Sequence, residues 1–501
     1  MASTETTPIL EGKAESAAAS LSEAKSTRWK PSAIVADIAT LGTGTLLSGL
    51  FNVALVFVVP KLLRLEDYGY WRLFGLYAGY VGFLHLGFAN GALLRWAGRP
   101  LEEFHHEIRP ALTYLLWQHV IVLVPVCVIA WLVLPGPLRF VGIAVAIYAP
   151  IYNLTTTLQI GLQSARIFRP VAISTAAAPA LFLGLALLWH LEWQSNYREV
   201  TSFYVTGWLI VLVLLLTWTK PWSSVRRELD IKSLAKDCVL SGWPMVMANM
   251  GVMLIGFADR LAVSWAATIQ NFAQYSLAGS AMAVPIMAIQ ACSSVFFSHL
   301  ANVTTDGRKW IYGIASRMLL VAWMILLPYY FALDVFVRHV LPKYIPSLGY
   351  ARVLLLGIPF LAAIQILQMS YAYLNGMQKH FLAQTAAVLA VSLGVTSFAA
   401  FHASSLRIVA GVQVAVLGAW WLVNEFALRN LTGQSKEGWA KFALVYALAG
   451  ASYWVTTGPL LNVGAAIGLY YLSVGMIVGL CCREELRLVF RQIVARPGTV
   501  T

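Results

Sequence analysis

The chain has 501 residues, of which 59% are apolar and 11% charged, and its formal net charge is +13 at pH 7. A water-soluble domain carries about 25% charged and about 45–50% apolar residues. This composition argues against a soluble enzyme, a disordered protein and a secreted disulfide scaffold. It indicates a membrane protein with many spans, because fourteen spans of about 20 apolar residues would use nearly all the apolar residues present.

The two ends of the chain differ from the middle. Residues 1–35 are predicted to form a disordered cytoplasmic tail, because most of them are Ala, Ser, Thr or Glu and no apolar run occurs among them. For the same reason we expect no signal peptide. Residues 483–501 are predicted to form an amphipathic cytoplasmic tail, in which Leu486 and Phe490 lie on one side of a short helix and Arg487 on the other.

Fourteen apolar stretches of spanning length follow one another along the chain. Placing both termini in the cytoplasm puts most of the 35 Lys and Arg residues in cytoplasmic loops, as the positive-inside rule requires. The longest outer loop, residues 333–350, is short, so we expect no large catalytic domain outside the membrane. The expected spans are 36–59, 70–94, 111–134, 138–162, 171–190, 201–219, 236–257, 273–299, 311–333, 351–375, 381–402, 408–428, 440–457 and 461–480.

Short motifs recur after six spans. Leu47-Ser48-Gly49 is matched by Leu240-Ser241-Gly242, and Gly161-Leu162-Gln163 is matched by Gly376-Met377-Gln378. Six spans per unit make both units enter the membrane from the same side, an arrangement typical of transporters that rock around a central cavity. We therefore predict an all-α membrane protein with two six-helix bundles and two extra C-terminal helices. The expected parts are an N-lobe at 36–220, a basic cytoplasmic linker at 221–235, a C-lobe at 236–430, and two further spans at 431–482.

Polar residues within the spans group on single helix faces. Such groups usually face a bundle interior or a water-filled cavity, although small polar residues also serve helix packing and arginines near span ends also anchor the chain at the interface. Arg72 and Asn90 are five full turns apart, so a continuous helix places them on one face. Arginine can hold a phosphate or pyrophosphate through paired hydrogen bonds. The candidate cavity residues are Asn52, Arg72, Asn90, Arg95, Gln159, Gln163, Arg260, Arg317, Gln368, Asn375, Gln378 and Lys379.

No motif predicts catalysis or a bound cofactor. The sequence has no GxxxxGK[ST] loop, so we do not expect the chain to hydrolyse a nucleotide by itself. It also lacks the HExxH and GxSxG motifs. None of its five cysteines lies in a CxxC pair, so neither a metal site nor a disulfide framework is expected. The sequence therefore favours a transporter with no catalytic residues and no cofactor.

Three segments carry a family resemblance. Residues 41–74 read LGTGTLLSGLFNVALVFVVPKLLRLEDYGYWRLF, and residues 85–95 read HLGFANGALLR. This pattern resembles the N-terminal part of the bacterial polysaccharide transporters, the Wzx-type oligosaccharide flippases of the MATE-like MOP flippase superfamily. Further matches are Asp259-Arg260-Leu261 with Tyr275-Ser276-Leu277-Ala278, and the Gly-Leu-Gln and Gly-Met-Gln pair above. The resemblance covers the first twelve spans, and the last two suit the fourteen-span members.

The resemblance implies a fold and a function. Two six-helix bundles would form a V around a cavity that opens alternately to the two sides of the bacterial inner membrane. The cargo would be an oligosaccharide on an undecaprenyl-type pyrophosphate, moved to the outer leaflet for surface polysaccharide biosynthesis. Arg72 and Arg260 would meet the pyrophosphate, and Asn52 would meet the sugars. Implied partners are membrane lipid, this lipid-linked oligosaccharide, and the glycan polymerase and glycosyltransferases of the pathway, with no nucleic acid.

Other functions stay open at this point. A lipid II flippase or a multidrug and cation antiporter would share the superfamily fold. Antiporter relatives usually carry a carboxylate within the first helix, whereas the acid here is Asp37 at its cytoplasmic end, so the driving ion stays unassigned. A membrane-embedded glycan polymerase or ligase would need a long outer loop with catalytic Arg and His. The loop with Arg338 and His339 is short. A non-transporting scaffold for glycan enzymes is a further alternative.

Overall fold

The computed structural model describes residues 31–222, 230–282, 285–286, 305–432, 436–458, 462–481 and 483. Within these ranges the chain is helical and contains no strand. Eleven of the helices there are long and apolar enough to cross a membrane. The all-α membrane fold is therefore confirmed. Nearly all of the two predicted tails, part of the basic linker and the second half of the predicted eighth span lie outside the described residues.

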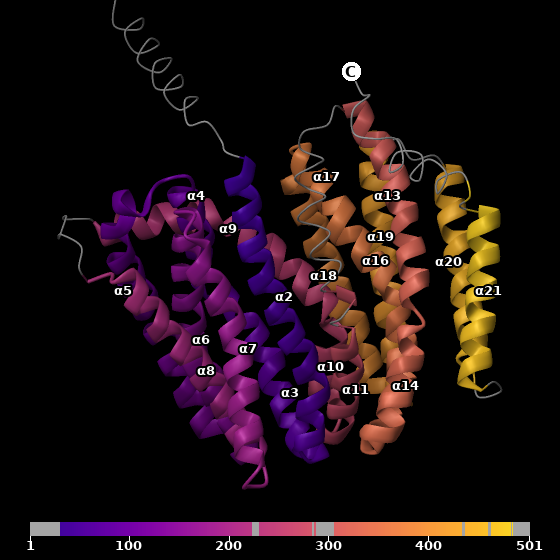
Figure 1. The fold of residues 1–501 in the computed structure, drawn as a ribbon, viewed down its shortest axis with the longest axis horizontal. Helices are drawn as coiled ribbons and strands as arrows, with labels where there is room; N and C mark the ends of the chain where they lie inside the picture. Colours follow the sequence, from indigo (N-terminus) through magenta and orange to yellow (C-terminus); the bar gives the residue numbers. More distant parts are fainter. Residues whose placement is uncertain are drawn as a thin grey trace, which may run out of the picture.

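The first bundle holds the helices that precede the linker (Figure 1). We call the end where its first helix begins the upper end, and the opposite end the lower end. Its α-helices are α2 (Pro31–Leu62), α3 (Leu65–Tyr80), α4 (Phe88–Trp96), α5 (Leu101–Val133), α6 (Gly136–Ser164), α7 (Phe168–His190) and α8 (Tyr197–Thr219).

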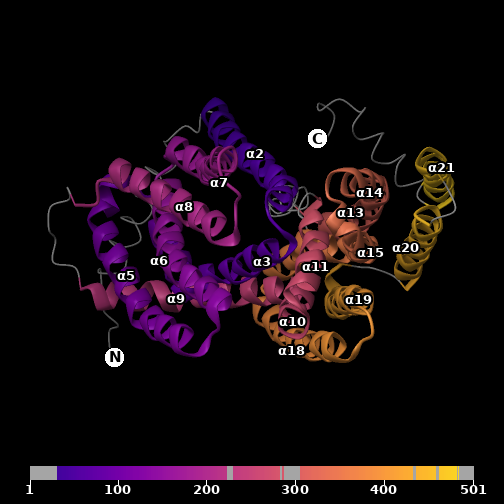
Figure 2. The ribbon, with the colours of Figure 1, turned by 90° about the horizontal axis from the view of Figure 1, so that it is seen from below.

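The second bundle lies beside the first, with two more helices at its outer edge (Figure 2). Its leading helix, α9, starts against the first bundle at the upper end and crosses to the second (Figure 1). The α-helices are α9 (Ile231–Gly256), α10 (Ala258–Ala266), α11 (Ile269–Ala281), α13 (Thr305–Leu326), α14 (Tyr329–Val340), α15 (Ile345–Leu354), α16 (Ile358–Ala362), α17 (Met369–Leu374), α18 (Gln378–His402) and α19 (Leu406–Thr432). The edge helices are α20 (Lys436–Thr456) and α21 (Val463–Cys481).

The predicted second span is not one continuous helix. Between α3 and α4 the chain forms a 3-10 turn, η1 (Val81–His85), followed by Leu86 and Gly87 with φ angles of 52° and 93°. Glycine adopts such a positive φ without strain. The freed carbonyl groups are satisfied from neighbouring helices, because Asn153 donates to the carbonyl of Val81 at 2.8 Å and Gln118 to that of Leu84 at 2.8 Å. Amide side chains thus stabilise a broken helix at membrane depth.

The two bundles touch at the lower end through α3 and α11. The backbones approach closely there, since a Cβ added at Gly69 would lie 2.5 Å from the carbonyl oxygen of Ile269. Beside this contact the rings of Tyr68 and Tyr344 meet edge to face, with 5.3 Å between centroids. Lys343 donates to the backbone carbonyl of Leu63. These contacts join the start of the second span to the second bundle.

The bundles also touch at the upper end, through α4 and α9. A Cβ at Gly91 would lie 1.8 Å from the carbonyl oxygen of Cys238, and one at Gly242 would lie 2.0 Å from the carbonyl oxygen of Gly87. Even the methyl group of an alanine does not fit between these two backbones. Gly242 belongs to the motif that the sequence repeats after six spans, and the structure gives it this packing role. The two bundles are therefore in contact at both ends.

Glu107 holds the upper end of the first bundle together. Its side chain is almost fully buried on α5 and accepts a hydrogen bond from Trp96 at 2.9 Å. Arg95 pairs with the same carboxylate at 2.8 Å and Arg99 at 3.4 Å. Glu107 lies outside the predicted third span, 111–134, because α5 begins earlier than expected, at Leu101.

Replacing Glu107 by alanine is expected to destabilise the protein by about 1–3 kcal/mol, because it leaves the buried indole N–H group of Trp96 without an acceptor. The measurement is the midpoint of thermal aggregation of the purified protein in detergent. Glu103→Ala is the matched control, since this exposed carboxylate lies one turn earlier on α5 and pairs with Arg99 at 3.5 Å. Equal midpoints for the two variants would contradict this role for Glu107.

Candidate substrate cavity

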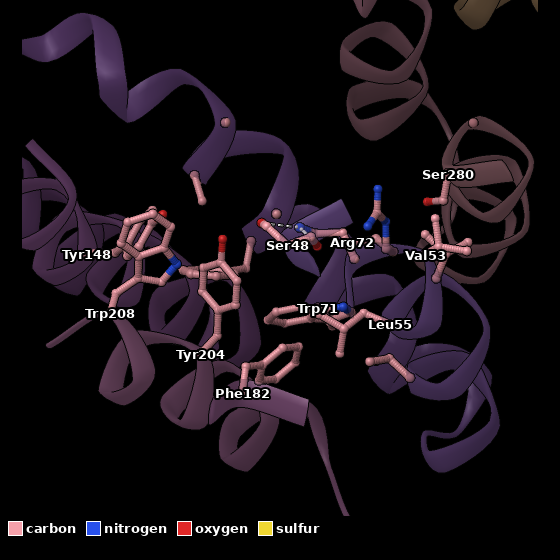
Figure 3. Close-up of a pocket in the computed structure, with 18 of the residues that line it drawn as sticks. Ser48, Val53, Leu55, Trp71, Arg72, Tyr148, Phe182, Tyr204, Trp208 and Ser280 are labelled. Carbon is pink, nitrogen blue, oxygen red and sulfur yellow. Dashed lines mark hydrogen bonds between the residues drawn. The ribbon is translucent and has the colours of Figure 1, made fainter. Parts of the chain in front are cut away.

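A cavity of about 610 Å³ lies between the first bundle and the start of the second. We call it the N-lobe cavity, because most of its wall comes from α2, α3, α6, α7 and α8. The second bundle contributes Phe257, Arg260, Gly279, Ser280 and Ile286. Figure 3 shows Arg72 and Ser280 on one side of it and the rings of Tyr148, Tyr204 and Trp208 on the other.

A second cavity, of about 620 Å³, lies in the other bundle, and we call it the C-lobe cavity. Phe257, Arg260 and Ile286 line both cavities, so the two meet at Arg260. The remaining polar wall of the C-lobe cavity comes from α9, α10, η4 (Ala363–Gln368, a π-helical turn) and α19. Its polar side chains are those of Asn249, Asp259, Arg260, Gln365 and Gln413.

One polar face of α2 lines the N-lobe cavity. Thr45, Ser48, Gly49 and Asn52 recur at helical spacing along this face. The amide group of Asn52 donates to the carbonyl of Ser48 at 2.8 Å, and its side chain is exposed to the cavity. These groups give the cavity a strip of neutral hydrogen-bonding atoms.

Two arginines from different bundles line the same cavity. Arg260 donates to the carbonyl of Gly279 at 2.9 Å and lies 4.5 Å above the ring of Phe257. The Nε atoms of Arg72 and Arg260 are buried and have no hydrogen-bond partner within the described part of the chain. Guanidinium groups with free donors in a semi-enclosed space suit a phosphate or pyrophosphate, which accepts paired hydrogen bonds.

One carboxylate accompanies these arginines. Asp259 is 2% exposed, and the hydroxyl group of Tyr275 donates to its Oδ2 atom at 2.7 Å. Asp259 lies just beyond the predicted seventh span, 236–257. The chain continues there into α10, which ends at Ala266, and the residue is buried inside the bundle. The described charged side chains that line the two cavities are two guanidinium groups and one carboxylate. Together they carry one net positive charge, which favours an anionic ligand.

Aromatic side chains form the wall opposite Arg72. Trp71 lies 5.1 Å from Phe182 between ring centroids, and Tyr152 lies 5.1 Å from Trp208. Aromatic faces carry negative charge and attract the C–H groups of a sugar ring. None of these aromatic residues is among the cavity candidates predicted from the sequence. The signal that could have found them is the i, i+4 spacing of Tyr148 with Tyr152 and of Tyr204 with Trp208.

Gly279 makes room for Arg260, because a Cβ there would lie 2.3 Å from the Nε atom of that arginine. Gly279→Ala is therefore expected to displace the guanidinium group and weaken cargo binding about as much as Arg260→Ala, with thermal stability unchanged. Cargo binding and thermal midpoint are both measured. Gly75→Ala is the control, since Gly75 also lines the cavity but a Cβ there would touch nothing within 4 Å. Wild-type binding by Gly279→Ala would refute this role.

The structure brings Asn52, Arg72 and Arg260 together in one cavity and places the other candidates elsewhere. Arg95 lies at the upper end, paired with Glu107 and 3.9 Å from Asp237 of α9. Asn90 lines neither cavity, because the η1 turn ends the helical register that joined it to Arg72. The single face predicted from residue 72 to residue 90 is therefore wrong.

The remaining candidates are distributed over several helices of both bundles. Gln159 donates to Ser174 of α7 at 2.9 Å, and Gln368 is buried inside the second bundle. Asn375 donates to the carbonyl of Tyr371 at the end of α17. Three more candidates line neither cavity, namely Gln163, Arg317 and Lys379. Lys379 is exposed, whereas Gln163 and Arg317 are half-buried. The side chain of Gln378 lies outside the described residues.

Known structures share this architecture. The inward closed conformation of the lipid II flippase MurJ matches with a TM-score of 0.64, covering 90% of this chain and 100% of that one at 11% identity. A MATE family multidrug transporter of the MOP superfamily matches in two conformations. The outward-facing one has a TM-score of 0.54 at 12% identity, and the inward-facing one has a TM-score of 0.52 at 14% identity. Each match covers 80% of this chain and 96% of that one. By sequence, no protein-family model and no curated protein matches. The chain therefore has the fold of MOP superfamily flippases and transporters.

Proposed function

We propose that this chain is a flippase of the bacterial inner membrane that moves a polyprenyl-pyrophosphate-linked oligosaccharide from the cytoplasmic to the outer leaflet. One observation carries the proposal. Arg72 and Arg260 come from different bundles, line one cavity and keep donors that no described protein group accepts. A pyrophosphate at these arginines would bridge the bundles, and its sugars would meet the aromatic wall and Asn52. The cargo would serve surface polysaccharide biosynthesis.

The charge of the cavity weighs against one alternative. A multidrug antiporter that exports organic cations would need an acidic or neutral cavity, whereas the joined cavities carry two arginines and one aspartate. A positive cavity repels a cation before contact. The alternating opening of the two ends would then expose the anionic cargo first to one side and then to the other. In this proposal the upper end faces the cytoplasm, where both termini lie.

Lipid II is a second candidate cargo. The likeness to MurJ extends over 90% of this chain, and the arginine pair would suit that cargo as well. The two proposals share the site and the direction of movement, and they differ in the glycan. Competition for one purified protein therefore separates them.

Flipping in proteoliposomes tests the proposal. The purified chain is reconstituted with fluorescent undecaprenyl-pyrophosphate oligosaccharide, with lipid II, or with ethidium as a cationic dye. A membrane-impermeant glycan-cleaving enzyme then reports exposure of each glycolipid on the outside. We expect transfer of the oligosaccharide lipid. Transfer of lipid II alone would favour the second candidate, and movement of ethidium alone would refute both.

A deletion strain gives the cellular counterpart of this test. Without the protein, lipid-linked oligosaccharide should accumulate on the cytoplasmic face, and surface glycan should be lost. Normal surface glycan together with altered drug tolerance would contradict the proposed function.

A further inference from the structure

A carboxyl group lies buried inside the second bundle, apart from both cavities. Glu425 of α19 is 2% exposed and accepts hydrogen bonds from Tyr312 of α13 and from Gln368 of η4, the latter at 3.1 Å. Each of the three residues lies about two helical turns from the upper end of its span. The group therefore sits within reach of the upper surface but inside the packed core.

No cation compensates this carboxyl group within the part of the chain that the structure describes. No ion pair joins it to a basic side chain there, and Arg429, one turn further along α19, is exposed. Its Oε2 atom has no hydrogen-bond partner in that part, and neither does the buried Oε1 atom of Gln368. A charged carboxylate in such surroundings is strongly disfavoured, whereas the neutral acid is tolerated.

The other groups around Glu425 are neutral or turned away. The ring of Tyr371 on α17 meets that of Tyr312 at 4.8 Å, and its hydroxyl group donates to the backbone carbonyl of Arg308. Asn424, adjacent on α19, is 1% exposed, and both polar atoms of its amide lack a partner among the described residues. The indole group of Trp439 on α20 also faces Glu425. The groups around Glu425 are thus phenol, amide and indole groups, none of which carries a charge.

We propose that Glu425 is a proton-binding site of this chain. The carboxylate takes up one proton on its Oε2 atom and becomes the neutral acid, and no other bond changes. A metal cation fits the site less well, because it needs several oxygen ligands around an open space. Glu425, Tyr312 and Gln368 are almost completely buried and line neither cavity. A proton needs no such room.

The π-helical turn η4 connects this site to the C-lobe cavity. Gln368, at the end of η4, donates to the carbonyl of Trp421 at 3.0 Å as well as to Glu425. Gln365, in the same turn, lines the C-lobe cavity, as does Met369 directly after it. A charged carboxylate binds a donor more strongly than the neutral acid does. Deprotonation should therefore pull η4 toward α19, and protonation should release it.

Infrared difference spectroscopy of the full chain in lipid nanodiscs tests the proton site directly. The spectrum between acidic and alkaline pH should contain the carbonyl stretch of a buried protonated carboxyl group. Glu425→Gln should lose this band, and Tyr312→Phe should shift it because a phenol donor is removed. Glu192→Gln is the control, since Glu192 is exposed and its loss should leave the band in place.

Two results would overturn the proposal. One is a band that persists unchanged in folded Glu425→Gln and Tyr312→Phe protein. The other is a spectral change at Glu425 that follows sodium concentration at constant pH, which would make the site a metal-cation site. Neither result depends on the cargo.

The use of this proton for transport rests on the proposed function. Flipping by the wild type should respond to an imposed proton gradient, and the response should be lost in Glu425→Gln. If no glycolipid moves in any vesicle while the infrared band behaves as expected, the proposed function fails and the proton site stands. If flipping proceeds and Glu425→Gln responds to the gradient like the wild type, the coupling role fails.

Discussion

Replacing Arg72 or Arg260 by alanine is expected to lower cargo affinity about 10- to 100-fold, because each change removes charge-assisted hydrogen bonds to a pyrophosphate. Both side chains line the N-lobe cavity and keep buried donors without a described partner. Protein level and thermal midpoint should stay near those of the wild type, since neither guanidinium group pairs with a carboxylate in the described ion pairs. Export of lipid-linked oligosaccharide and binding of the purified cargo are the measurements.

Arg64→Ala provides the matched control for this pair. Arg64 is exposed just before α3 and lies outside both cavities, so its loss removes one positive charge without touching the site. Arg260→Lys should fall between wild type and Arg260→Ala, because lysine keeps the charge and loses the paired contact. Wild-type export by both alanine variants would return these arginines to the role of interfacial anchors.

Adding a methyl group at Gly91 or Gly242 is expected to hold the upper end open. The Cβ atom would lie 1.8 Å or 2.0 Å from a backbone oxygen of the facing helix, so α4 and α9 must separate. Overpacking of this kind costs about 1–3 kcal/mol. A penalty of that size shifts the balance between closed and open forms about 5- to 150-fold. Transport should fall accordingly, because the cycle needs this end to close.

The thiol of Cys238 reports this opening. It is 1% exposed, at the contact with Gly91. In a background where the four other cysteines are replaced by alanine, maleimide labelling of Cys238 should be faster in Gly91→Ala than in the parent. Gly184→Ala is the control, since a Cβ there would touch nothing within 4 Å. Equal labelling rates in all three proteins would show that the α4–α9 contact does not gate access.

Much of the fold follows from the sequence because apolar length and helical periodicity are local properties. The same is true of the polar face of α2, where Thr45, Ser48 and Asn52 follow a regular register. Arg72 and Arg260 were selected by a family resemblance, and the structure places them in one cavity. The exact domain limits, and any role of the candidate residues in binding cargo, stay predictions.

The sequence misplaced two candidate residues, Asn90 and Gln368, because the helical register breaks near them, and it missed Glu107 for a different reason. Asn90 left the face of Arg72 because η1 and two positive φ angles separate α3 from α4. Gln368 faces the core because η4 is a π-helical turn, which rotates the residues after it away from α-helical spacing. Glu107 was missed because its partners, Trp96 and Arg95, come from a different helix. Such contacts depend on how helices pack, and no local pattern encodes them.

The joint at η1 has a consequence for the membrane itself. The second span touches the other bundle twice, with α3 at the lower end and α4 at the upper end. If the span were one stiff helix, a movement at one of these contacts would open the other. A hinge between the two pieces lets each contact form or part by itself. Under the proposed function, both contacts could then be closed while cargo is inside. Ions would find no continuous water path, and the cell would keep its membrane potential during each cycle.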